Sequence, residues 1–202
     1  MPLTHIMIYL NKITFKQDYR NLLKDFSIKF DDITLLVGDQ GCGKSSILDL
    51  LQKSDKEIIE YDLSDHVKKN GVKTFYFDTE KMNPRVADMD NYSNPDGTSK
   101  GIGGMAALSS RFMSHGESLR KFTVDIIHKA ENSVIFLDEP EASLSIKNQY
   151  KLAQNLWDAS KTCQFVIATH SMPIIESLAR VYDLENKKWV SSFDFINSQK
   201  II

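Results

Sequence analysis

The chain has 202 residues, a formal net charge of −2, and 42% hydrophobic and 26% charged residues. This composition predicts a single globular domain, and without a basic excess it gives no sign of a nucleic-acid partner, although it does not exclude one. No apolar run reaches the roughly 20 residues of a membrane helix, and the N-terminal residues lack a signal-peptide pattern. With only two cysteines there is no disulfide framework, so we expect a cytoplasmic protein without a membrane partner.

The spacing of apolar residues predicts the elements in chain order. Residues 6–15 and 25–37 predict antiparallel strands that end in a short buried strand. The elements expected after them are a helix at 44–53, a strand at 71–77, a helix at 117–130, a buried strand at 133–138, a helix at 146–161, a buried strand at 163–168 and a two-stranded finish at 180–195. Strands that alternate with helices predict an α/β fold with a mainly parallel core sheet flanked by helices.

The expected organisation is one domain over residues 1–202. An N-terminal antiparallel β part (1–32) precedes the α/β core (33–178), which carries a short helical insert (82–130), and strands at 179–202 complete the chain.

The segment "GDQGCGKS" fits the phosphate-loop pattern G-x-x-x-x-G-K-S between a buried strand and a helix. The backbone amides of such a loop surround phosphates, and the helix N-terminus adds its positive dipole. We expect Lys44 to reach the β- and γ-phosphates of ATP and the Ser45 hydroxyl to bind Mg²⁺. The alternative is a glycine-rich turn before a helix. The predicted ATP-binding residues are Gly38, Asp39, Gln40, Gly41, Cys42, Gly43, Lys44, Ser45 and Ser46.

Polar side chains end two later buried strands. Asp138 and Glu139 follow the first, at the sheet edge where the phosphate loop should also lie. Asp138 can hold Mg²⁺, and Glu139 can orient or deprotonate the attacking water. His170 follows the second strand and can hydrogen-bond the γ-phosphate. The alternatives are carboxylates that end a strand and a histidine that caps one.

The order of the phosphate loop, "SHGES", "LDEPEASLS" and "ATHS" over residues 30–173 resembles the ABC-type ATPase superfamily. The resemblance is to its non-transporter branch, which includes small AAA-type ATPases and the heads of chromosome-maintenance proteins. It implies an ABC-head-like fold and a head-to-tail homodimer that encloses ATP and Mg²⁺ between two copies.

The resemblance also implies site residues. Ser114, His115, Gly116 and Glu117 stand at the signature motif that contacts ATP on the other copy, with histidine in place of the usual first glycine. Ser114 and Glu117 also fit a helix capping box. Ser143 and Ser145 lie in the loop that crosses the dimer interface.

Two further family features are the residue that stacks on adenine and the glutamine that binds Mg²⁺. Tyr19 is the candidate to stack on adenine, with core packing as an equal alternative. The glutamine that usually binds Mg²⁺ after the strand at 71–77 is missing, and Asp78 or Glu80 can replace it.

The resulting hypothesis is a Mg²⁺-dependent ATPase that couples dimerisation to a partner protein or nucleic acid. The alternatives are the nucleotide-binding subunit of a membrane transporter, a phosphate-loop small-molecule kinase, and a binding module with very slow ATP turnover.

Overall fold

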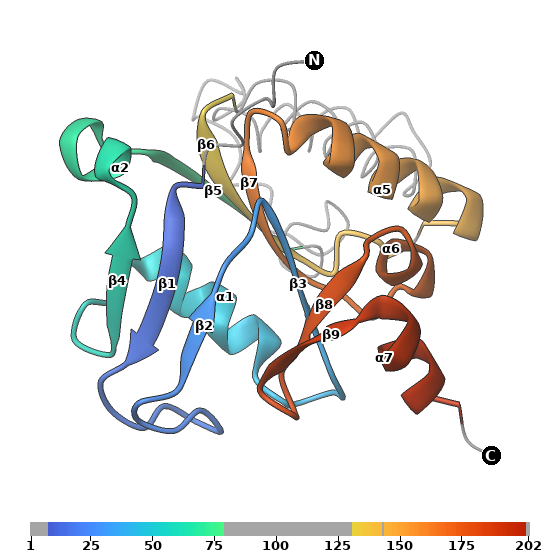
Figure 1. The fold of residues 1–202 in the computed structure, drawn as a ribbon, viewed down its shortest axis with the longest axis horizontal. Coiled ribbons are helices and arrows are strands. Elements are labelled where there is room, and N and C mark those ends of the chain that lie inside the picture. The colour runs from blue at the N-terminus through green and yellow to red at the C-terminus, as the bar shows by residue number, and fades with distance from the viewer. Residues whose placement is uncertain (1–7, 79–130, 143, 201–202) are drawn as a thin grey trace, which may run out of the picture.

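The structure is a computed structural model that describes residues 8–78, 131–142 and 144–200. Its centre is a six-stranded sheet with the strand order β5-β6-β7-β3-β8-β9 (Figure 1). Neighbouring strands are parallel from β5 through β8, and β9 pairs antiparallel with β8. The strands are β3 (Ile33–Val37), β5 (Lys73–Asp78), β6 (Ser133–Asp138), β7 (Gln164–Ala168), β8 (Arg180–Asp183) and β9 (Lys188–Ser191). The expected α/β fold with a mainly parallel sheet is confirmed.

A smaller antiparallel sheet has the order β2-β1-β4, with β1 at Leu10–Phe15, β2 at Ser27–Lys29 and β4 at Ile59–Leu63. It confirms the antiparallel lobe but is not confined to residues 1–32. The strand β4 follows the phosphate-loop helix and returns to pair with β1, with Phe15 opposite Ile59. Both of these side chains are fully buried, so the pairing closes an apolar core that the first 32 residues cannot complete alone.

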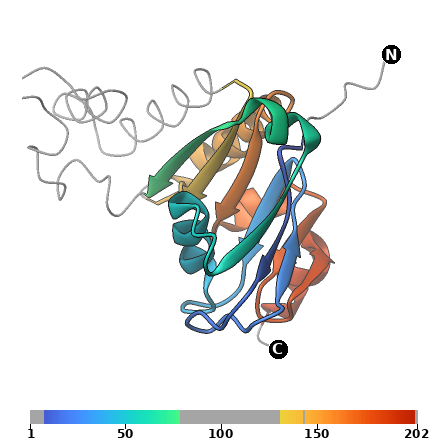
Figure 2. The ribbon, with the colours of Figure 1, turned by 90° about the vertical axis from the view of Figure 1, so that its left-hand side faces the viewer.

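The described helices are α1 (Lys44–Lys53), α2 (Asp65–Asn70), α5 (Ile146–Ala159), α6 (Met172–Glu176) and α7 (Ser192–Ser198). Figures 1 and 2 show α1 and the small sheet on one side of the main sheet and α5, α6 and α7 on the other. Buried side chains alternate between the two faces, because successive residues of a strand point in opposite directions. In β6, Val134 and Phe136 pack toward α1, whereas Ile135 and Leu137 pack toward α5.

The C-terminal part of the described chain departs from the expected two-stranded finish. The strands β8 and β9 form as expected, but residues 192–198 are the helix α7. The Ser191 hydroxyl accepts a hydrogen bond from the Asp194 backbone N–H at 3.0 Å, which is a helix N-cap and ends the strand. Phe195 then packs into the core on the α5 side. Across the described residues, no helix is both long and apolar enough to cross a membrane.

Candidate nucleotide site

A cleft of about 530 Å³ lies at the carboxyl ends of β5, β6 and β7, next to the loop between β3 and α1. In open parallel sheets, ligands bind beyond the carboxyl ends of the strands. The cleft is lined by Arg20, Gln40, Gly41, Gly43, Lys44, Ser45, Ser46, Asp49, Tyr76, Asp78, Asp138, Glu139 and His170. Most of the predicted phosphate-loop residues and both carboxylates of the β6 end are therefore in one place.

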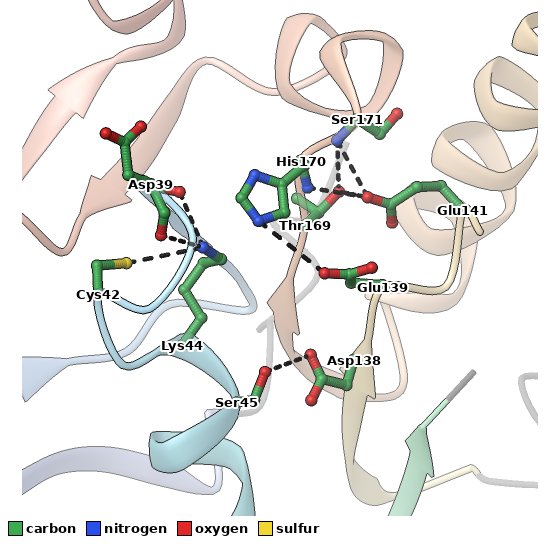
Figure 3. Close-up of polar contacts among 11 residues, drawn as sticks. Asp39, Cys42, Lys44, Ser45, Asp138, Glu139, Glu141, Thr169, His170 and Ser171 are labelled. Carbon is green, nitrogen blue, oxygen red and sulfur yellow. Dashed lines mark hydrogen bonds and ion pairs between the residues drawn. The ribbon is translucent and has the colours of Figure 1, made fainter. Parts of the chain in front are cut away.

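The loop folds around the Lys44 ammonium group. Lys44 Nζ donates hydrogen bonds to the carbonyl oxygens of Gly38 at 2.8 Å and Asp39 at 2.9 Å, and the residue is only 6% exposed (Figure 3). Gly43 precedes α1 with a φ of 111° and supplies no side-chain cap. No side chain at that position caps the first backbone N–H groups of α1, so these groups are suited to donate hydrogen bonds to an anion.

The loop and the β6 end meet through Ser45 and Asp138. The Ser45 hydroxyl donates a hydrogen bond to Asp138 Oδ1 at 3.1 Å (Figure 3). These two residues lie 93 positions apart, so the parallel arrangement of β3, β7 and β6 brings them together. A hydroxyl oxygen beside a carboxylate oxygen is a suitable pair of ligands for Mg²⁺.

Asp78 is the described alternative to Glu80, which lies outside the described residues. It ends β5 directly beside Asp138 in the strand register and also lines the cleft. The Tyr76 hydroxyl donates a hydrogen bond to Asp78 Oδ2 at 3.2 Å. Burial, followed by the nearby carboxylates of Asp78 and Asp138, raises the pKa of Tyr76 well above its ordinary value, so this phenol remains a donor.

Glu139 has a left-handed backbone conformation with a φ of 46°, which is unfavourable for a residue with a Cβ atom. Its backbone N–H donates to the Ala168 carbonyl at 2.9 Å, which ties the end of β6 to β7. Its carboxylate Oε1 lies 3.9 Å from His170 Nε2. Strained backbone conformations of this kind concentrate at functional sites.

Glu141 is a buried carboxylate that the sequence analysis did not single out. Its Oε1 accepts three hydrogen bonds: from the Thr169 hydroxyl at 2.7 Å, the His170 backbone N–H at 2.9 Å and the Ser171 backbone N–H at 3.1 Å (Figure 3). Burial raises the pKa of Glu141 above its ordinary value, and the Thr169 hydrogen bond partly opposes that rise. Its second oxygen, Oε2, is buried without a hydrogen bond in the described part of the chain.

At the N-terminal side of the cleft, the structure places Arg20 rather than Tyr19 in the lining. Tyr19 is half-buried and packs against the core beneath α1, which is the packing alternative considered for it. Arg20 Nη1 donates a hydrogen bond to the Ser46 hydroxyl at 2.7 Å. The sequence signal for Arg20 is weak, since a single arginine in a loop has no pattern around it.

The remaining predicted residues divide into two groups. Cys42 is half-buried on the loop with its Sγ 3.7 Å from Lys44 Nζ, and Ser145 is exposed at the N-cap of α5. The residues Glu80, Ser114, His115, Gly116, Glu117 and Ser143 lie outside the described residues.

Considering only residues 8–78, 131–142 and 144–200, no group of three or more His, Cys, Asp or Glu side chains forms a metal site alone.

Comparison with known proteins gives a family match over residues 34–187, to the "ATPase family associated with various cellular activities (AAA)". One similar protein is the zinc import ATP-binding protein ZnuC of Acinetobacter baylyi, 24% identical over 85% of this chain and 70% of that protein.

Two solved structures share the fold. An ATP-binding cassette of an ABC transporter, in its ADP conformation, has a TM-score of 0.58 at 14% identity and covers 91% of this chain and 90% of its own. The SMC head domain from Thermotoga maritima has a TM-score of 0.56 at 13% identity and covers 87% and 94%.

Proposed function

The chain belongs to the ATPase family associated with various cellular activities, and on this premise we propose that it binds and hydrolyses ATP in the cleft at the β6 end. The observation that carries the proposal is the Ser45–Asp138 contact of 3.1 Å. It brings a phosphate loop and a paired carboxylate to the two sides of one cleft, which is the arrangement that phosphoryl transfer uses.

In this proposal the phosphates of ATP replace the loop carbonyls as partners of Lys44. The ammonium group now bonds Gly38 and Asp39 and needs only a change of its side-chain rotamers to reach a bound anion. Ser45, Asp138 and Asp78 would hold Mg²⁺, which when bound neutralises charge on the phosphate oxygens.

Glu139 is the proposed base or orienting group for the attacking water. Its carboxylate Oε1 lies 3.9 Å from His170 Nε2 and both residues line the cleft, so the two side chains can contact a common reactant there. His170 is 46% exposed and its imidazole can donate a hydrogen bond to the γ-phosphate.

We further propose that two copies associate head to tail around ATP. The support is the likeness in fold to cassette and SMC-head structures together with the exposed Ser145 at the start of α5. The nucleotide held by one copy would be contacted by Ser114, His115 and Gly116 of the other. Association and separation of the two copies would then act on a partner protein or on nucleic acid.

The test measures phosphate release and molar mass by light scattering, with and without Mg-ATP. We expect the wild type to release phosphate and Glu139→Gln to bind ATP without turnover. We also expect Glu139→Gln to shift from 23.1 kDa to about twice that mass only with ATP. Glu60→Gln, an exposed substitution on β4, is the matched control. Absence of ATP binding in the wild type would refute the function; binding without a mass change would refute the dimer.

A second candidate is the nucleotide-binding subunit of a membrane transporter. The observation that favours it is the similarity to a zinc import ATP-binding protein over 70% of that protein's length. The two candidates differ in their partner. A transporter subunit should co-purify with a membrane protein after gentle detergent extraction, whereas the leading proposal predicts ATP-dependent association without one.

A further inference from the structure

We propose that Glu141 is a positioning residue that holds His170 beside Glu139 in the cleft, by binding the segment Thr169–Ser171 to the segment that follows β6. This inference rests on the proposed ATPase function. Glu141 itself does not line the cleft, so its effect on the reaction would be exerted through His170.

The first part of the argument is the hydrogen-bond pattern at Glu141. One carboxylate oxygen accepts from three consecutive residues, Thr169, His170 and Ser171, at 2.7 to 3.1 Å. Two of the donors are backbone N–H groups, so the contact fixes the path of the main chain at His170. Fixing the main chain restricts where the imidazole can lie.

The second part is a further set of hydrogen bonds that links the same two segments. The Ser171 hydroxyl donates to Gln149 Oε1 at 2.8 Å, and Gln149 Nε2 donates to the Leu144 carbonyl at 2.9 Å. The Ser171 hydroxyl also accepts from the Ile174 N–H at 3.2 Å, which caps α6. The segment after β6 and the segment after β7 therefore form one hydrogen-bonded unit, with Glu139 on one segment and His170 on the other.

The third part is burial. Glu141 is 8% exposed and Thr169 is 1% exposed, so water cannot readily replace a lost hydrogen bond between them. The chain keeps a carboxylate in this poorly solvated place although Oε2 has no hydrogen bond to any described residue. A group that served packing alone would be better replaced by an apolar side chain. The retained carboxylate is explained if its three acceptor contacts are needed to shape the cleft.

The test is a double-mutant cycle on steady-state ATP hydrolysis with the full chain, using Glu141→Ala, His170→Ala and the double variant. We expect Glu141→Ala to lower kcat by about tenfold or more, with KM changed by less than about twofold. In the His170→Ala background the same change should lower kcat by less than about twofold, because the group that it positions is already absent.

Two further variants keep the test decisive. Glu141→Gln retains an acceptor oxygen for the three donors and should keep kcat within about threefold of the wild type. Thr169→Val removes one donor with little change in shape. It should show the same dependence on His170, which matters if Glu141→Ala does not fold.

A purely structural role for Glu141 predicts a different result. The fold-reduction of kcat in the double variant would then equal the product of the reductions in the two single variants, and that outcome would overturn the inference. An unchanged kcat in Glu141→Ala would also overturn it. If the wild type itself does not hydrolyse ATP, the proposed function fails and the inference with it. These failures are distinguishable because only the last one appears without any substitution.

Discussion

Gln164 and Leu10, which lie 154 positions apart, exchange two hydrogen bonds of 2.8 Å: the Leu10 N–H donates to Gln164 Oε1, and Gln164 Nε2 donates to the Leu10 carbonyl. The same amide accepts from the Tyr9 N–H at 3.1 Å and donates to the Asp31 carbonyl at 2.9 Å. The Gln164 side chain is fully buried at the start of β7. The side-chain amide thus pairs with the Leu10 backbone as the backbone of a neighbouring strand would, and it joins the small antiparallel sheet to the main sheet.

We predict that Gln164→Ala lowers the free energy of unfolding by about 3 kcal/mol, because four backbone polar groups lose a partner at a buried position. Chemical denaturation checks the value. The control is Gln154→Ala on the exposed side of α5, which should cost less than about 0.5 kcal/mol. Equal losses in the two variants would show that the bridge between the sheets contributes nothing of its own.

A second prediction concerns the left-handed backbone at Glu139, where φ is 46°. Glu139→Gly and Glu139→Ala both remove the carboxylate and should both abolish ATP turnover. Glycine adopts this conformation without a Cβ penalty, so the glycine variant should be more stable than the alanine variant by about 1 kcal/mol. Paired denaturation curves measure the difference, and an alanine variant that is the more stable of the two would argue against strain at this position.

A third prediction separates two glycines of the phosphate loop. Gly41 and Gly43 both have positive φ angles. A Cβ atom added at Gly43 would lie 3.3 Å from Leu22 Cδ2, whereas a Cβ atom added at Gly41 would have no neighbouring atom within 4 Å. Leu22 is buried and cannot withdraw easily. Gly43→Ala should therefore lose about 1 kcal/mol more stability than Gly41→Ala.

The same pair can be compared by ATP binding. Calorimetry should show a larger loss of affinity for Gly43→Ala, because that residue also sets the start of α1. Equal losses of affinity would mean that backbone strain alone governs the loop.

The fourth prediction is a pH dependence of stability. Burial, followed by the negative charge of Asp55, raises the pKa of Tyr61 to about 12, and its hydroxyl donates to the Leu50 carbonyl at 3.1 Å. An unfolded tyrosine loses its proton near pH 10. The folded state thus holds more protons than the unfolded state between about pH 10 and 12, and the free energy of unfolding should fall as pH rises through that window.

The comparison for this prediction is Tyr61→Phe, which has no phenolic proton at that position. Urea denaturation between pH 9 and 11.5 should show a flatter decline for the variant than for the wild type. Parallel declines would place the alkaline sensitivity elsewhere in the molecule.

The central part of the fold could be predicted from the sequence because its signals are local. The strands β3, β6 and β7 are short apolar runs that end in glycine or polar residues, and the phosphate-loop pattern fixes the position of α1. The strand β4 was not predicted, because only one of its five residues, Ile59, is buried, and its pairing with β1 depends on the tertiary arrangement. The helix α7 was missed because its N-cap, Ser191, is also the last residue of strand β9.

The candidate site shows the same division. Lys44, Ser45, Asp138 and Glu139 belong to motifs with fixed spacing, and the structure brings them into one cleft. Arg20 and Glu141 have no such spacing. Their positions depend on a loop with a left-handed residue and on contacts between segments 28 to 30 residues apart.

The place of β3 in the sheet has a consequence for how the protein is made. This strand carries the phosphate loop, yet its two neighbours in the sheet, β7 and β8, are translated much later. A nascent chain that has emerged only as far as β6 contains the whole loop motif but neither strand that holds β3 in register. Contacts of this long range form slowly, since a long stretch of chain must be ordered first. We therefore expect the phosphate loop to take up its native geometry only after β7 and β8 have been translated and have paired with β3.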